Sequence, residues 1–327
     1  MEPSVEVLLS PEDLTESLRA DVRAGLSAPP GQRSLPPKWF YDKRGSQLFD
    51  EITRLPEYYP TRRERSVLEE RATTIMAGQV STLIELGSGT SDKTKLLLDA
   101  GLTSGHLRRF VPFDVSEETL RAAAYSLAVR YPALSIHAVV GDFEQHLGSL
   151  SAIGQPGQRL VAFLGGTIGN FEPLARRHFL LSLASALAPG DRLLLGTDLV
   201  KDPSRLVVAY DDPKGVTAEF NRNVLVVIDR ELDADFDPQG FDHVARWDVE
   251  AEWIEMRLRA KHQQVVTVSD LALQVSFADG EEMRTEISAK FRPEGVETEL
   301  AAAGFTLDQW WTDRHGDFGV SLSHRSP

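Results

Sequence analysis

Short apolar runs alternate with amphipathic stretches in the middle of the chain, between residues 81 and 200. The runs have the length of buried strands, and the stretches between them have the apolar spacing of helices. We expect strands at 81–87, 108–115, 134–143, 159–167 and 191–200, and helices at 93–100, 117–130 and 173–187. Apolar strands separated by helices predict a parallel sheet that helices cover on both faces.

The chain returns to this pattern near its C-terminus. A helix closed by Gly304 precedes the runs FTLDQWWTD and FGVSLSHR, which predict two final strands. The stretch from 201 to 290 differs, because its apolar and polar residues alternate as in antiparallel strands with one solvated face. We expect helices there at 203–209 and 216–232, and strands at 242–249, 251–260 and 263–268. The sequence therefore predicts an α/β domain interrupted by an α+β insert.

The N-terminal segment is expected to be helical. Ser10 as N-cap and Pro11 at the first helical position predict an amphipathic helix that ends near Leu26. A Pro-rich loop, a short helix at 46–53 and a charged helix from Thr61 follow. We expect this segment to pack with the insert, so the predicted domains are 63–200 plus 291–327, and 1–62 plus 201–290.

Composition and charge narrow the class of partner. The 327 residues are 42% hydrophobic and 26% charged, as in an ordinary globular protein, and the length suits two domains. The net charge of −14 opposes binding to a phosphate backbone, so we expect a small-molecule partner and no nucleic acid. The chain has no cysteine, which excludes disulfides and Cys-ligated zinc, and the histidines lack metal-ligand spacing, so no metal is expected.

Neither a membrane span nor a signal peptide is apparent. No stretch of 18 apolar residues occurs, and the N-terminus begins acidic, without a basic region followed by an apolar one. We therefore expect a cytoplasmic protein that has no membrane partner, and we favour a monomer.

Candidate ligand-binding residues follow the carboxyl ends of the expected parallel strands, where open α/β sheets bind ligands. Gly87 and Gly89 allow a tight turn and close approach of a ligand, although the third glycine of a G-x-G-x-x-G motif is absent. Asp114 follows the second strand and can accept from ribose hydroxyls; a helix cap is the alternative. Asp142 follows the third strand and can accept from an adenine amino group, with Phe143 on the ring; an exposed loop carboxylate is the alternative. These acids suit a nucleoside across the strand tips.

The glycine turn and the two acids resemble the class I S-adenosylmethionine-dependent methyltransferases. This resemblance implies a Rossmann-like seven-stranded sheet, whose seventh strand lies antiparallel between the fifth and the sixth. It also implies S-adenosylmethionine as cofactor and S-adenosylhomocysteine as product. A narrower resemblance, to the L-histidine Nα-methyltransferases of ergothioneine biosynthesis, extends from about Leu35 to the C-terminus. It is carried by PPKWFYDKRGSQLFDEITRLPEYYPTRRE, ELGSGTSDKT, FLGGTIGNF, LVVAYDDPKGVTAEFNRN and MRTEISAKF.

The narrower resemblance implies roles for residues of the cofactor and substrate sites. The cofactor-binding residues implied are Gly87, Gly89, Lys93, Asp114, Asp142 and Phe143. Asn170 and Tyr210 are implied as donors to the histidine carboxylate, Tyr58 as a substrate contact, and Tyr41 as a residue that orients the amine. Without the resemblance, core packing is an equal alternative for the tyrosines.

Glu286 and Ser288 are the candidates for recognising the imidazole. They are two residues apart, so they share one face of a strand, and a carboxylate with a hydroxyl suits an imidazole N–H. Met256, on a neighbouring strand, is a candidate apolar wall. The alternative, favoured without the resemblance, is that this pair lies on the solvent face of an antiparallel strand.

The narrower resemblance implies an enzyme that methylates the α-amine of L-histidine three times, giving hercynine, the first step of ergothioneine biosynthesis. One alternative is a methyltransferase of the same fold that acts on another amino acid or small amine and does not need Glu286 and Ser288. Another is a catalytically silent nucleoside-binding protein. The intact glycine turn and strand-end acids argue against that last alternative.

Overall fold

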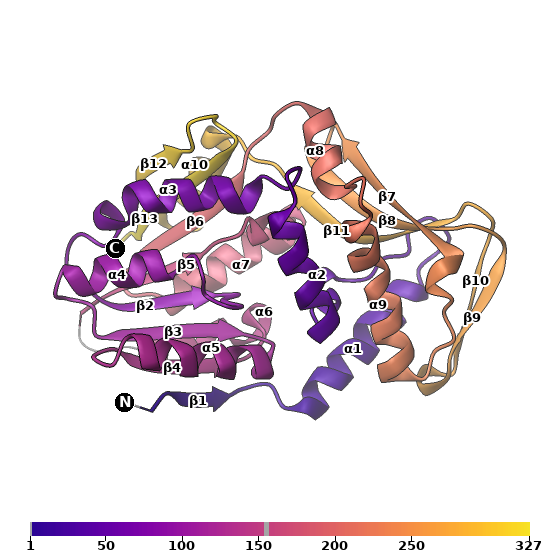
Figure 1. Cartoon of the computed structure of the whole chain (residues 1–327), viewed down its shortest axis with the longest axis horizontal. Coiled ribbons are helices and arrows are strands. Elements are labelled where there is room, and N and C mark those ends of the chain that lie inside the picture. The colour runs from indigo at the N-terminus through magenta and orange to yellow at the C-terminus, as the bar shows by residue number, and fades with distance from the viewer. Residues whose placement is uncertain (1, 154–156) are drawn as a thin grey trace. The chain divides into compact units, whose positions relative to one another are not determined.

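The computed structural model describes residues 2–153 and 157–327, and it divides into two compact units (Figure 1). Unit 1 contains the residues up to Leu9, Pro60–Val200 and Lys290–Pro327, and unit 2 contains Ser10–Tyr59 and Lys201–Ala289. The sequence assigned residues 1–62 to the second domain, whereas residues 2–9 lie in unit 1. The reason is the strand β1 (Ser4–Val7), which pairs in parallel with β4 (Ser135–Val140).

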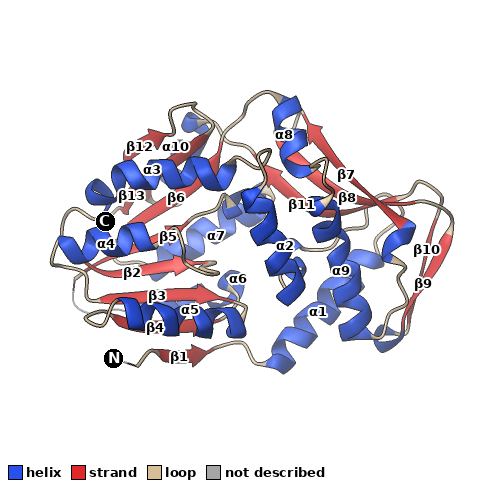
Figure 2. Cartoon of the chain, in the orientation of Figure 1, coloured by secondary structure: helices blue, strands red, loops and turns tan. Residues whose placement is uncertain are grey.

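Unit 1 is built on an eight-stranded sheet in the order β1-β4-β3-β2-β5-β6-β13-β12 (Figure 2). The other strands are β2 (Val80–Leu86), β3 (Arg109–Asp114), β5 (Gln158–Phe163), β6 (Arg192–Asp198), β12 (Phe305–Thr312) and β13 (Phe318–Arg325). The strands from β1 to β6 in this order are parallel, and β13 is antiparallel to both of its neighbours. The expected sheet with its antiparallel last strand is confirmed, and β1 is an addition that the apolar pattern did not predict.

Helices cover both faces of this sheet. They are α3 (Pro60–Ile75), α4 (Lys95–Thr103), α5 (Glu117–Arg130), α6 (Phe143–His146), α7 (Pro173–Ala186) and α10 (Pro293–Ala302), with 3-10 turns η2 (Leu147–Ala152) and η3 (Thr167–Asn170). Leu68, Leu97 and Leu127 of α3, α4 and α5 pack with alternate strand residues on one face. Phe163 of β5 points to the other face, where Phe179 of α7 packs against it. Burial on both faces explains the continuous apolar runs of these strands.

Unit 2 combines helices with two small antiparallel sheets. Its helices are α1 (Pro11–Leu26), α2 (Lys43–Arg54), α8 (Pro203–Tyr210) and α9 (Val216–Leu232), with 3-10 turns η1 (Pro37–Phe40), η4 (Pro238–Gly240) and η5 (Ser269–Leu271). One sheet contains β11 (Glu282–Ala289), β8 (Trp253–Ala260) and β7 (Phe241–Asp248), and the other contains β10 (Leu273–Phe277) and β9 (Gln264–Val268). The helix α9 has the predicted bounds, and Ser10 caps α1 as predicted, in a capping box with Asp13.

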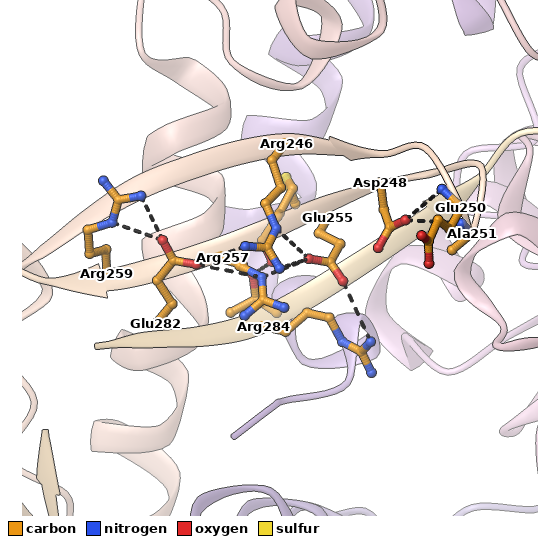
Figure 3. A network of polar contacts seen from close by, with 11 residues as sticks. Arg246, Asp248, Glu250, Ala251, Glu255, Arg257, Arg259, Glu282 and Arg284 are labelled. Atoms are coloured by element: carbon orange, nitrogen blue, oxygen red, sulfur yellow. Dashed lines mark hydrogen bonds and ion pairs between the residues drawn. The ribbon is translucent and has the colours of Figure 1, made fainter. Parts of the chain in front are cut away.

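The sheet β11-β8-β7 has one apolar face and one charged face. Ile254, Met256 and Leu258 of β8 lie in the core of unit 2. The opposite face carries an ion-pair network that joins Arg246, Glu255, Arg257, Arg259, Glu282 and Arg284 (Figure 3). Burial alone raises the pKa of Glu255, but its hydrogen bonds with the arginines outweigh burial and lower that pKa. The predicted two-sided sheet is confirmed, with the difference that Glu255 is buried beneath its arginine partners.

Candidate active site

The turn after β2 carries the two glycines of the ELGSGTS segment. Gly87 and Gly89 have φ angles of +67° and +47°, in the left-handed region that other residues rarely adopt. The Gly87 N–H donates to the carbonyl oxygen of Phe113, at the end of β3, over 2.8 Å. A Cβ at Gly87 would lie 3.8 Å from the Phe143 ring. The turn therefore lies beside the aromatic residue that the sequence assigned to the same cofactor site.

Asp114 and Asp142 follow the neighbouring strands β3 and β4. Asp114 accepts from the Gly89 N–H at 2.9 Å and from the Ser116 N–H at 3.0 Å, so it fastens the glycine turn to the start of α5. Burial raises the pKa of Asp114, and these donors oppose that shift. A carboxylate has about four acceptor positions, so ribose hydroxyls can still bind Asp114. Asp142 is buried and caps α6 through the Glu144 N–H at 2.8 Å, so it is not an exposed loop carboxylate.

Buried polar groups in the glycine turn suit a polar ligand. Ser88 Oγ is buried and makes no hydrogen bond within the described ranges 2–153 and 157–327. A buried hydroxyl without a partner costs about 1–3 kcal/mol, so a ligand that bonds to it gains that contribution. Glu85 is buried and accepts a hydrogen bond from Thr94. Burial raises the pKa of Glu85 to about 7, against the hydroxyls of Thr94 and Ser91, which lower it. These groups fit the amino-acid portion of S-adenosylmethionine.

Glu64 of α3 is a site residue that the sequence pattern did not reveal. Its side chain is fully buried, one carboxylate oxygen accepts from the Gly165 N–H at 2.7 Å, and the other forms an ion pair with Lys93. A Cβ at Gly196 would lie 2.1 Å from Glu64 Oε1, so only glycine leaves room for this carboxylate. Glu64 therefore positions Lys93, a predicted cofactor-binding residue. A single acid in a charged helix is usually solvated, so the segment RRERS gave no signal.

Asn170 is the last residue of η3, directly after β5 and its glycine turn. Gly165 and Gly166 have φ angles of +84° and +72°, which turn the chain sharply between the strand and η3. Asn170 is half-buried. It belongs to unit 1, whereas the other predicted substrate residues belong to unit 2.

In unit 2 a chain of aromatic rings links three predicted substrate residues. Tyr41 and Tyr58 each meet Phe49 edge-on, with ring centroids 5.5 and 6.1 Å away. Tyr58 meets Tyr210 in the same manner at 6.1 Å, and the Tyr210 hydroxyl lies 2.7 Å from Ser288 Oγ. Tyr58 and Tyr210 are buried, whereas Tyr41 is 38% exposed. The structure thus brings Tyr41, Tyr58, Tyr210 and Ser288 together from separate segments of the chain.

Glu286 and Ser288 lie on the apolar face of the sheet β11-β8-β7 because β11 contains a bulge. Arg284 and Glu286 pair with consecutive residues of β8, so Thr285 is an extra residue in β11. Such an insertion shifts the alternation of side chains by one position. Glu286 therefore leaves the charged face of Arg284 and lies directly opposite Met256. The alternative placement of the pair, on the solvated face, does not occur.

Two general features of the described part of the chain bear on its partners. Among these residues, no group of three or more His, Asp or Glu side chains is arranged to hold a metal ion. Over the same residues, the structure contains no helix with the length and apolar character that a membrane crossing demands.

Known proteins are similar to this chain over most of its length. The sequence model of a family described as "Histidine-specific methyltransferase, SAM-dependent" matches residues 18–325. A histidine N-alpha-methyltransferase of Mycolicibacterium smegmatis is 58% identical over 97% of this chain and 98% of that protein. Its counterpart from Mycobacterium tuberculosis is 58% identical over 94% of both chains. The ergothioneine biosynthesis protein 1 of Schizosaccharomyces pombe is 32% identical over 80% of this chain and 34% of that protein.

Proposed function

The chain belongs to the histidine-specific, S-adenosylmethionine-dependent methyltransferases, and we propose that it transfers three methyl groups to the α-amine of L-histidine. The product is hercynine, and the reaction is the first step of ergothioneine biosynthesis. The observation that supports this substrate best is the bulge of β11, which places Glu286 and Ser288 beside Met256 and Tyr210. A methyltransferase for an amine whose side chain carries no hydrogen-bond donor would not need a carboxylate at this position.

Residues of unit 1 bind the cofactor in this proposal. When bound, S-adenosylmethionine supplies a methyl group on a sulfonium, which is already an activated leaving group. The turn at Gly87 and Gly89 lets the backbone approach the ligand closely. Asp114 accepts from the ribose, Asp142 accepts from the adenine amino group, and Phe143 packs on the ring. Lys93, held by Glu64, carries the positive charge that suits the cofactor carboxylate.

Residues of unit 2 recognise the substrate. An imidazole N–H requires an acceptor, which Glu286 provides. Ser288, on the same face of β11, contacts the ring through its oxygen and keeps its proton for the hydrogen bond to Tyr210. Tyr210 donates to the substrate carboxylate. Tyr58 contacts the substrate, and Met256 forms an apolar wall. Each buried polar contact matters for specificity, because an analogue that lacks the matching group leaves a buried partner unbonded.

Catalysis depends mainly on alignment and desolvation, since displacement at the methyl group needs no covalent enzyme intermediate. The amine must be neutral before each transfer. An α-amine has a pKa of about 8, so water can accept most of the protons that the amine loses. Tyr41 is partly exposed and orients the amine through water. No side chain is required as an obligatory base.

Mass spectrometry with a labelled methyl donor tests the proposal directly. Purified protein with L-histidine should give a product that carries three labelled methyl groups, and histidine should be the best substrate among the amino acids. A better amino acid would favour the alternative of another amine substrate. Calorimetry that shows heat from S-adenosylhomocysteine but none from histidine would exclude histidine as substrate. If, in addition, no label is transferred to any amino acid or small amine, the alternative of a silent nucleoside-binding protein is favoured.

A further inference from the structure

The bulge of β11 is held by two side chains, one within the strand and one on a helix outside the two strands that form it. A bulge interrupts the ladder, and buried backbone groups near it need other partners. The carbonyl oxygen of Met256 lies 3.0 Å from Thr285 Oγ1, and the carbonyl oxygen of Arg257 accepts from Asn221 Nδ2 at 3.0 Å. Thr285 and Asn221 are fully buried. The bulge is therefore held by a threonine within it and by an asparagine of α9.

Asn221 extends this network from the bulge to α8. Thr285 Oγ1 donates to Asn221 Oδ1 at 2.6 Å and shares its single proton with the Met256 carbonyl oxygen. Asn221 Nδ2 lies 2.8 Å from His243 Nδ1. Because Asn221 donates to Nδ1, the proton of the His243 ring is on Nε2, which donates to the carbonyl oxygen of Tyr210 at 2.8 Å. The His243 side chain is 2% exposed, and burial favours this neutral form.

The network closes through Tyr210. Its backbone carbonyl accepts from His243, and its hydroxyl lies 2.7 Å from Ser288 Oγ, back on β11. The loop of contacts thus passes through β11, α9, β7 and α8 and includes the residue directly before Glu286. Buried hydrogen-bond networks of this kind specify one arrangement, because each alternative leaves a donor or acceptor unbonded.

We propose that Thr285, Asn221 and His243 are positioning residues, which hold β11 in the bulged register that turns Glu286 toward histidine. This inference rests on the proposed function and deepens it. Without the bulge, the period of two would return Glu286 to the charged face of Arg284 and bring Ile287 to the apolar face. An apolar residue in that place suits the ring of tryptophan better than imidazole. Selectivity for histidine then depends on residues that need not touch it.

The test compares kinetic constants of single variants. Thr285→Val keeps the shape and removes the hydroxyl, and we expect it to raise the KM for histidine about tenfold while the affinity for S-adenosylhomocysteine stays within about twofold. Thr285→Ser keeps the hydroxyl, so its KM for histidine should stay near that of the unmodified protein. At the other end, His243→Gln can still donate to the Tyr210 carbonyl, whereas His243→Asn cannot, so His243→Asn should have the higher KM. Ile228→Val is the control, since it trims the same core on α9 and removes no polar contact.

A double-mutant cycle separates positioning from general destabilisation. In a background that carries both Glu286→Ala and Ser288→Ala, Thr285→Val should change the KM for histidine less than about twofold, because its effect passes through these two residues. The ratio of tryptophan to histidine turnover should rise in Thr285→Val and not in Ile228→Val.

Additive effects, an unchanged KM in Thr285→Val, or equal effects of the two His243 variants would overturn the inference while leaving the proposed function intact. If the unmodified protein does not methylate histidine, the proposed function fails, and the inference fails with it. If Thr285→Val does not fold, the difference in KM for histidine between His243→Gln and His243→Asn tests the inference.

Discussion

The ion pair between Glu64 and Lys93 should contribute strongly to the stability of unit 1. Glu64 is fully buried and Lys93 is 21% exposed. Breaking a fully buried pair typically costs about 3–5 kcal/mol, and a hydrogen bond to a charged group contributes about 1.5–3 kcal/mol. Since water reaches Lys93, the loss should lie below the range for a fully buried pair and within the range for a hydrogen bond to a charged group. The variant Glu64→Gln keeps an acceptor for the Gly165 N–H, so we expect it to lower the free energy of unfolding by about 2–3 kcal/mol.

Urea unfolding of the variant and of a matched control measures this loss. Glu69→Gln lies on the same helix and removes an ion pair with Arg65 in which both side chains are 49% exposed. Exposed pairs contribute about 0–1 kcal/mol, so the control should stay near the unmodified protein. Gly196→Ala should destabilise the fold by a different route, because its Cβ would lie 2.1 Å from Glu64 Oε1. Equal losses in Glu64→Gln and Glu69→Gln would refute the reasoning.

Three further results are expected. Asp114→Ala should weaken the binding of S-adenosylhomocysteine by about 1–3 kcal/mol, as measured by calorimetry. An unchanged affinity would show that Asp114 only stabilises the glycine turn and the start of the helix. The pKa of Glu85, raised to about 7, means that the native state retains a proton that the unfolded chain loses near pH 4.5. The free energy of unfolding should therefore fall by about 3 kcal/mol between pH 4.5 and pH 8, and Glu85→Gln should remove that fall in urea titrations at both pH values. Glu286→Ala should raise the KM for histidine about ten- to hundredfold, leave cofactor affinity unchanged and favour tryptophan relative to histidine; a parallel fall of both substrates would contradict the assignment.

The fold could be predicted where an element is buried in a regular pattern along its length. Strands buried on both faces gave continuous apolar runs, and α9 gave an apolar stripe whose ends match the helix. The strand β1 was missed because it is an edge strand of four residues, and three of them are exposed, so it carries no apolar run. It pairs with β4 through backbone hydrogen bonds, which do not depend on the hydrophobicity of the side chains.

The positions of the glycine turn and of the acids at the strand ends could be predicted from local motifs, whereas their roles stay predictions. The glycine turn and the acids after β3 and β4 are sequence-local, because the ends of neighbouring parallel strands meet at one edge of the sheet. Glu64 could not be found in this way, since its role depends on Lys93 and on the glycine at 196, both distant in the sequence.

The segment EMRTEISA of β11 is the place where pattern and structure disagree, and the disagreement has a physical cause. Strict alternation groups Glu286 with Arg284 on the charged face, and Thr285 with Met283 and Ile287 on the apolar face. The structure keeps Thr285 buried but inserts it as a bulge, so that Glu286 changes face. Nothing within the strand forces this choice, because the partner that bonds Thr285 is Asn221, on a helix of another segment. A carboxylate on an apolar face conflicts with the local pattern, and such conflicts are expected where function outweighs local stability. If Glu286 binds the substrate as proposed, the substrate preference of this chain should respond to a change in the buried amide of Asn221 as well as to a change in β11.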